Sequence, residues 1–191
     1  MGDLVNDVKY AVYNENGSIN CQVRPAGITE YLPYTAGEND TDAFGKVLWQ
    51  QLIEGKWGVP APFIATPAQL VSVKQAKRVE INRWRDTQES GNYPFELDGH
   101  RWDCGKATQA RLSPVVSVAH AGLLPASFFW TDADNNDVPM TADKLIALEA
   151  AMQQQMVVEG FKIHERQRQM KEDIDLMTDY TAVKNYVVGW S

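Results

Sequence analysis

The sequence has no long hydrophobic run. Its first residues, MGDLVNDVKY, lack the apolar core of a signal peptide, and no later stretch approaches the roughly 20 apolar residues that cross a bilayer. These absences predict a protein with neither an export signal at this end nor a membrane as partner.

An excess of basic residues is also lacking. The 191 residues include 18 Lys and Arg against 25 Asp and Glu, which gives a formal net charge of −7. A general nucleic-acid binder needs a basic surface to displace counterions from phosphates, so we expect no nucleic-acid partner. The most basic segment, residues 68–90, is interpreted as a helix with a solvated charged face, and a basic contact surface for an acidic partner is the alternative.

Cysteine and histidine are few, and the common catalytic patterns are missing. Cys21 and Cys104 lie far apart in the chain and are expected to be free thiols. No phosphate loop, metal-spaced histidine pair or nucleophile elbow is present. His100, Asp103 and Cys104 suggest a thiol site, but His100 falls at a predicted turn and Cys104 on the following strand, so both are interpreted as structural. We expect no catalytic residues, no cofactor and no enzymatic activity.

The segment WTDADNNDVPMTAD, residues 130–143, resembles a calcium-binding loop in its spacing. Such a loop needs flanking helices, a glycine at its sixth position and a glutamate at its twelfth. Here strand-forming residues precede it, Asp137 replaces the glycine, and an aspartate takes the last position. We therefore predict a hairpin loop followed by a capped helix and no bound metal. The residues that remain weak metal candidates are Asp132, Asp134, Asn136 and Asp143.

Two sections are predicted along the chain. Residues 1–66 form a small module, with a hairpin turning at Asn16-Gly17 and then a helix over 39–55 capped by Asp40 or Thr41 and ended by Gly55. Residues 67–191 contain more helix, with a second hairpin turning at Asp98-Gly99. The predicted fold class is α+β, in which small antiparallel hairpins pack with several helices, including one long C-terminal helix.

The long helix is predicted from Ala142 to about Met177. Its apolar residues recur near the helical period, and a second face carries Val157 and Phe161. At about 50 Å it is longer than a small domain easily covers, so part of it is expected to contact a partner or a second copy, making a homo-oligomer one expectation. Candidate partner-binding residues on this helix and among the tryptophans are Met152, Met156, Phe161, Ile163, Met170, Trp49, Trp57 and Trp130.

Several segments carry a family resemblance. EINRWRDTQE, FELDGHRWDC, LPASFFWTDADNNDVPMTADKLIAL and IHERQRQMKEDID, all between about Lys77 and Trp190, resemble a family of domains of unknown function that is common in tailed bacteriophages. The segment PYTAGENDTDAFGKVLWQQLIEGKWGVPAP is similar to the openings of phage tail-fibre and tail-fibre-assembly proteins. The resemblance implies a tail-fibre assembly factor or a small tail component, and it supplies no catalytic residues.

Three classes of function follow from these observations. The first is a non-catalytic tail-fibre assembly protein, a chaperone or adaptor that binds the receptor-binding fibre in the cytoplasm of the bacterial host. This class includes an adaptor that stays bound to the fibre in the virion tail. The second is a structural baseplate or tail-tip component. The third is an enzyme such as a thiol hydrolase or a metal-dependent depolymerase, which the missing motifs disfavour.

Overall fold

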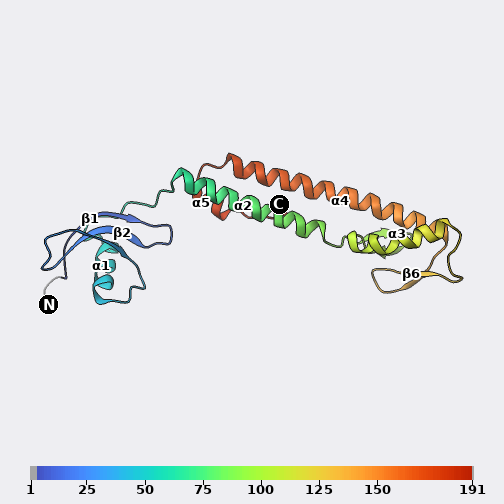
Figure 1. Ribbon diagram of the computed structural model, residues 1–191, viewed down its shortest axis with the longest axis horizontal. Helices are drawn as coiled ribbons and strands as arrows, with labels where there is room; N and C mark the ends of the chain where they lie inside the picture. Colours follow the sequence, from blue (N-terminus) through green and yellow to red (C-terminus); the bar gives the residue numbers. More distant parts are fainter. Residues whose placement is uncertain (1–3, 191) are drawn as a thin grey trace. The chain divides into compact units, whose positions relative to one another are not determined.

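A computed structural model describes residues 4–190 of the chain. It is an α+β protein made of small antiparallel sheets and helices, one of them long and C-terminal, as the sequence predicts (Figure 1). The chain divides into two compact units that meet in sequence between Thr66 and Pro67. No helix in the described part of the chain is long and apolar enough to span a membrane.

The first unit is a three-stranded antiparallel sheet with one helix. Strands β1 (Val5–Tyr13), β2 (Ile19–Pro25) and β3 (Leu32–Ala36) pair in that order, and helix α1 (Ala43–Ile53) follows. The predicted hairpin turn at Asn16-Gly17 is confirmed, since it joins β1 to β2 and Gly17 has a φ of 84°. Alternate residues of β2 pack against Leu48 and Leu52 of α1, and together they form the core of this unit.

The predicted cap of α1 was wrong by one or two residues. Asp42 is the capping residue, and its carboxylate accepts the backbone N–H of Gly45 at 2.7 Å. The hydroxyl of Tyr34 donates to the carboxylates of both Asp40, at 3.0 Å, and Asp42, at 3.1 Å. The predicted end of the helix is confirmed by Gly55, whose φ of 78° is the left-handed conformation that suits glycine.

The second unit is organised around its longest helix. Helix α4 (Ala142–Leu176) has 35 residues, which agrees with the predicted helix, and α2 (Pro67–Glu89) and α3 (Lys106–His120) both pack along it (Figure 1). Helix α2 contacts the C-terminal half of α4, as Arg78 pairs with Asp175, while α3 contacts the N-terminal half. The short helix α5 (Tyr180–Asn185) packs on α2.

Two small hairpins complete the second unit. Strands β4 (Phe95–Leu97) and β5 (His100–Trp102) turn at Asp98-Gly99 as predicted, and β6 (Phe129–Thr131) pairs with β7 (Asp137–Pro139). Asp98 and Gly99 both have positive φ, which is the pattern of a tight hairpin turn.

The second unit has two separate hydrophobic cores along α4. One lies between α3, the hairpins and the first half of α4, with Leu112, Val116, Leu145 and Met152 at its centre. The other lies between α2, α5 and the last turns of α4. Gln167 is buried near the second core and donates its amide to Asn82 at 3.0 Å, which satisfies a polar group that would be costly to bury alone.

Candidate functional site

The β6–β7 loop is folded around one buried carboxylate. Asp132 has 5% of its surface exposed, and its Oδ1 accepts the backbone N–H groups of Asp134 at 2.9 Å and Asn136 at 2.8 Å. The Asn136 amide donates to the same carboxylate. The predicted hairpin loop is confirmed, because β6 and β7 pair on either side of it and Asp132 accepts hydrogen bonds from the backbone of the loop.

The other metal candidates point elsewhere. Asp134 is exposed and faces Arg101 at 3.5 Å. Asp143 lies in the first turn of α4, two residues after the capping Thr141, whose hydroxyl accepts the N–H of Lys144. Among the residues that the structure describes, no three His, Cys, Asp or Glu side chains gather as metal ligands would.

The buried carboxylate also joins the two hairpins of this unit. Oδ2 of Asp132 lies 3.1 Å from Nδ1 of His100 on β5, and the backbone N–H of Ala133 donates to the carbonyl of Arg101 at 2.7 Å. The pKa of Asp132 is lowered, first by the N–H of Asn136 and further by His100, although burial opposes the shift. Sequence reasoning placed His100 at a turn but gave no signal of this partner, since the two residues are 32 positions apart.

The three residues weighed as a thiol site do not form one. Cys104 is fully buried and its thiol donates to the carbonyl of Met152 at 3.5 Å. Burial raises the pKa of Cys104, so it carries little of the thiolate that a nucleophile requires. His100 is bound to Asp132, and Asp103 accepts the amide of Asn92 at 2.5 Å.

A cleft of about 430 Å³ opens beside Asp132, between α3 and the β6–β7 hairpin. One wall is apolar and is formed by Val115, Phe128 and Trp130. The other wall brings the Thr108 hydroxyl and the exposed Arg111 guanidinium together at 3.4 Å. We name this site the hairpin cleft; its lining residues are Asp103, Thr108, Arg111, Val115, Phe128, Phe129, Trp130, Thr131, Asp132 and Asn135.

The hairpin cleft combines exposed aromatic surface with an available cation. Phe129 is 51% exposed, and Arg111 forms no ion pair with any residue in the described part of the chain. The two carboxylates nearby already accept hydrogen bonds, from Asn92 to Asp103 and within the loop to Asp132. A cavity of this size, with an apolar wall and few polar groups, suits a large side chain or a small ligand.

Comparison with known families finds a match within the second unit. Residues 72–188 match the model of a domain of unknown function, DUF4376, and the match covers more than half of the 191 residues. The chain belongs to the DUF4376 family. No curated protein and no solved structure matches the chain.

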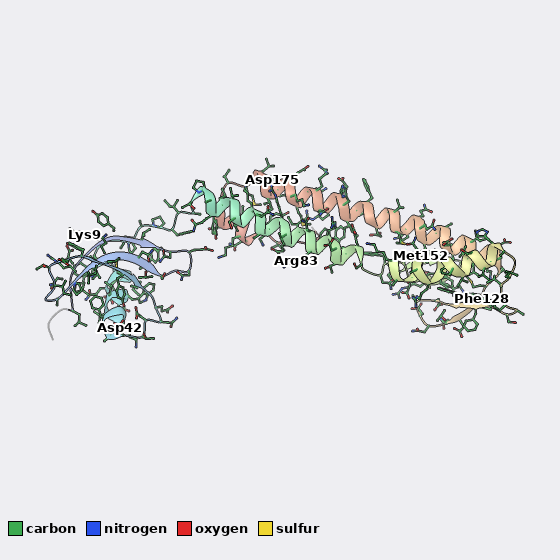
Figure 2. All side chains as sticks on the ribbon, viewed as in Figure 1. Lys9, Asp42, Arg83, Phe128, Met152 and Asp175 are labelled. Atoms are coloured by element: carbon green, nitrogen blue, oxygen red, sulfur yellow. The ribbon has the colours of Figure 1, made fainter. Side chains whose placement is uncertain are left out.

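The DUF4376 region contains most of the predicted partner-binding residues, and three of them are used inside the chain. Met152, Ile163 and Met170 are each at most 1% exposed. Met152 lies between α4 and α3 (Figure 2), and Met170 packs with Ile81 of α2. Met152 and Met170 fill the two cores of the domain, and Ile163 is buried beside a small cavity, so contact with another protein through them is not proposed further.

The remaining predicted residues reach the surface to different degrees. Phe161 is 66% exposed on the outer side of α4. Met156 is partly buried and lines a cavity of about 150 Å³ beside Gly160, whereas Trp130 lines the hairpin cleft. Trp49 and Trp57 lie outside the DUF4376 region and pack partly against the core of the first unit, where the Trp57 indole donates to Gln51 at 2.9 Å.

Proposed function

We propose that this chain is a non-catalytic tail-fibre assembly protein of a tailed bacteriophage. It binds the receptor-binding fibre in the cytoplasm of the bacterial host and acts there as a chaperone or adaptor. The segments that resemble phage tail proteins support the biological setting, and the hairpin cleft is the structural observation on which the proposal rests.

The hairpin cleft has the composition of a protein-binding anchor site. Aromatic residues and arginine are enriched where proteins bind one another, and a few of them usually supply most of the binding energy. Phe129 and Trp130 present aromatic surface from β6, while Arg111 approaches the same cleft from α3. We expect a protruding apolar side chain of the fibre to enter the cleft, and a neighbouring carboxylate of the fibre to pair with the guanidinium of Arg111.

The physical need for such a protein arises from fibre folding. A fibre of several chains must bring them into register before its long-range contacts form, so folding is slow and leaves apolar edges open to aggregation. A small partner that covers part of this surface keeps the fibre competent to assemble. The net charge of −7 on the partner favours solubility of the complex.

Co-expression with the fibre encoded beside this protein tests the proposal. We expect the wild-type chain to raise the soluble yield of the fibre and to co-purify with it. The double variant Phe129→Ala, Arg111→Ala should weaken the complex by roughly 30-fold or more, as loss of one strong interface anchor costs about 2 kcal/mol. Leu123→Ala is the matched control, because Leu123 is 72% exposed on the same unit but does not line the cleft.

The possible outcomes distinguish a wrong function from a wrong binding site. If the fibre is equally soluble alone and no complex survives gel filtration, the assembly function is wrong. If a complex forms but the double variant binds as well as wild type, the fibre binds elsewhere. Mass spectrometry of purified particles then decides between a transient chaperone and a structural baseplate or tail-tip component, since only the latter is present at fixed stoichiometry.

A further inference from the structure

The outer face of α4 lacks the charges of an ordinary solvated helix. Between Lys144 and Lys162 the only charged residues are Glu149 and Glu159. Glu149 accepts the hydroxyl of Ser113 on α3 at 2.7 Å, and Glu159 lines the cavity beside Gly160, so both lie away from the outer face. Over about 25 Å this face is therefore uncharged, although helix faces in water normally carry charged side chains.

Exposed apolar residues lie at the centre of this uncharged stretch. Val157 is 73% exposed, Phe161 66% and Val158 42%, and nothing in the described part of the chain covers them. The outward positions alternate in steps of three and four residues, which is the heptad spacing of helices that pair along a seam. We name this row the outer seam; its residues are Ala147, Ala150, Gln154, Val157 and Phe161, all exposed.

We propose that the outer seam pairs with the outer seam of a second copy of this chain, antiparallel and with a two-fold axis at Gln154. In this arrangement Phe161 of one copy lies opposite Ala147 of the other, and Val157 lies within one residue of Ala150. Large side chains then meet small ones on both sides of the axis, so the same surface is complementary to itself, as a two-fold interface requires. A parallel pair would place Phe161 on Phe161 and leave a gap between the alanines.

The polar groups agree with the antiparallel arrangement. At the axis, the two Gln154 amides each have a donor and an acceptor for the other, and a polar residue in a seam fixes its register. At each end, Lys144 lies within one residue of the position that faces Glu165 of the second copy. Asp143, which faces Glu165, lies within one turn of Arg168. A parallel pair would instead place each charge opposite its own copy.

The size of the seam sets the expected strength. From Asp143 to Glu165 the contact is about 33 Å long and about one helix wide, which places it at the low end of specific protein interfaces. Each copy carries a net charge of −7, which opposes association at low salt. We therefore expect a dimer that dissociates in the micromolar range and associates more tightly as salt is added.

Sedimentation of the full chain without any fibre tests the pairing. Wild type should shift from monomer to dimer with concentration. Val157→Glu with Phe161→Glu should weaken association at least about a hundredfold, because four unpaired carboxylates would be enclosed in the seam. Leu176→Glu is the control, since Leu176 is 82% exposed on the same helix but lies outside the seam, and it should leave the dimer intact.

Cysteine cross-linking tests the direction. Gln154→Cys should form a disulfide-linked dimer under mild oxidation, because the two-fold axis brings the two thiols together. Ala147→Cys should not, since antiparallel pairing separates the two positions by about 21 Å, yet it should cross-link to Phe161→Cys in a mixture. The native Cys21 and Cys104 are buried and contribute no background.

Three results would overturn the proposal. They are a wild-type chain that remains monomeric at hundreds of micromolar, a dimer that the paired glutamates leave unchanged, or an Ala147→Cys variant that cross-links to itself. The proposal is independent of fibre binding, which is assigned to the hairpin cleft and measured with a second protein present.

Discussion

Asp132 is the residue that explains why the aspartates and asparagines of the β6–β7 loop form a turn. Its carboxylate holds its own loop through two backbone N–H groups and also reaches His100 on the neighbouring hairpin. The sequence favoured a turn over a metal ligand at this position, and the folded chain supplies hydrogen-bond donors to both carboxylate oxygens. A carboxylate satisfied in this way orders the β6–β7 loop and thereby one rim of the hairpin cleft.

Replacement of Asp132 should give a pH-dependent loss of stability. The pKa of Asp132 is lowered on folding, so its stabilising contribution is present above its ordinary value of 3.8 and is lost as the pH falls through the lowered pKa. Asp132→Asn should therefore melt below wild type at about pH 7, and the difference should shrink toward about pH 3. Asp134→Asn is the control, as its exposed ion pair contributes little. A constant difference across this range would contradict the assignment.

At the scale of elements, the sequence predicted correctly those turns and helices that depend on residues close together in the chain. The turns at Asn16-Gly17 and Asp98-Gly99, the capped start of α4 and the length of α4 were all predicted correctly. The cap of α1 was misplaced because three residues that can cap a helix, Asp40, Thr41 and Asp42, stand next to one another, and the local pattern does not choose between them. The hairpin cleft was not predicted, since Arg111 and Trp130 come from separate elements and only their packing brings them together.

The two sides of α4 should respond differently to truncation. Ile163 is 1% exposed, and Ile163→Ala should cost about 2 to 5 kcal/mol, as a cavity remains in the packed interior. Phe161, two residues earlier, is 66% exposed, and Phe161→Ala should change the stability of the monomer by no more than about 0.5 kcal/mol. Denaturant unfolding at low protein concentration measures both. Equal effects would mean that the outward face of α4 is buried in the isolated chain.

At the scale of the whole molecule, each unit has its own hydrophobic interior. The first unit buries residues of its sheet against α1, and the second has one core on each half of α4. The DUF4376 match begins at residue 72, within the second unit. An interior of its own is the physical requirement for folding alone.

Residues 67–191 expressed alone should therefore fold. We expect a helical circular dichroism spectrum and a cooperative thermal transition, because the cores of this unit draw only on its own residues. The fragment should also retain the dimerisation proposed for the outer seam. A gradual melt without a transition would show that the first unit is needed for the stability of the second.

The pairing of α2 with α4 also has a consequence for synthesis on the ribosome. Arg78 of α2 pairs with Asp175, and Asn82 of α2 accepts the amide of Gln167. The inner side of α2 is therefore translated long before the residues of α4 that cover it. The first unit completes its sheet and helix from its own residues and can fold as soon as it emerges. At about 5 to 20 residues per second, the nascent second unit keeps Ile81 exposed for several seconds, until the last helices leave the exit tunnel. Rare codons within α4 would lengthen this interval and lower the yield of folded protein, whereas rare codons before residue 67 would not.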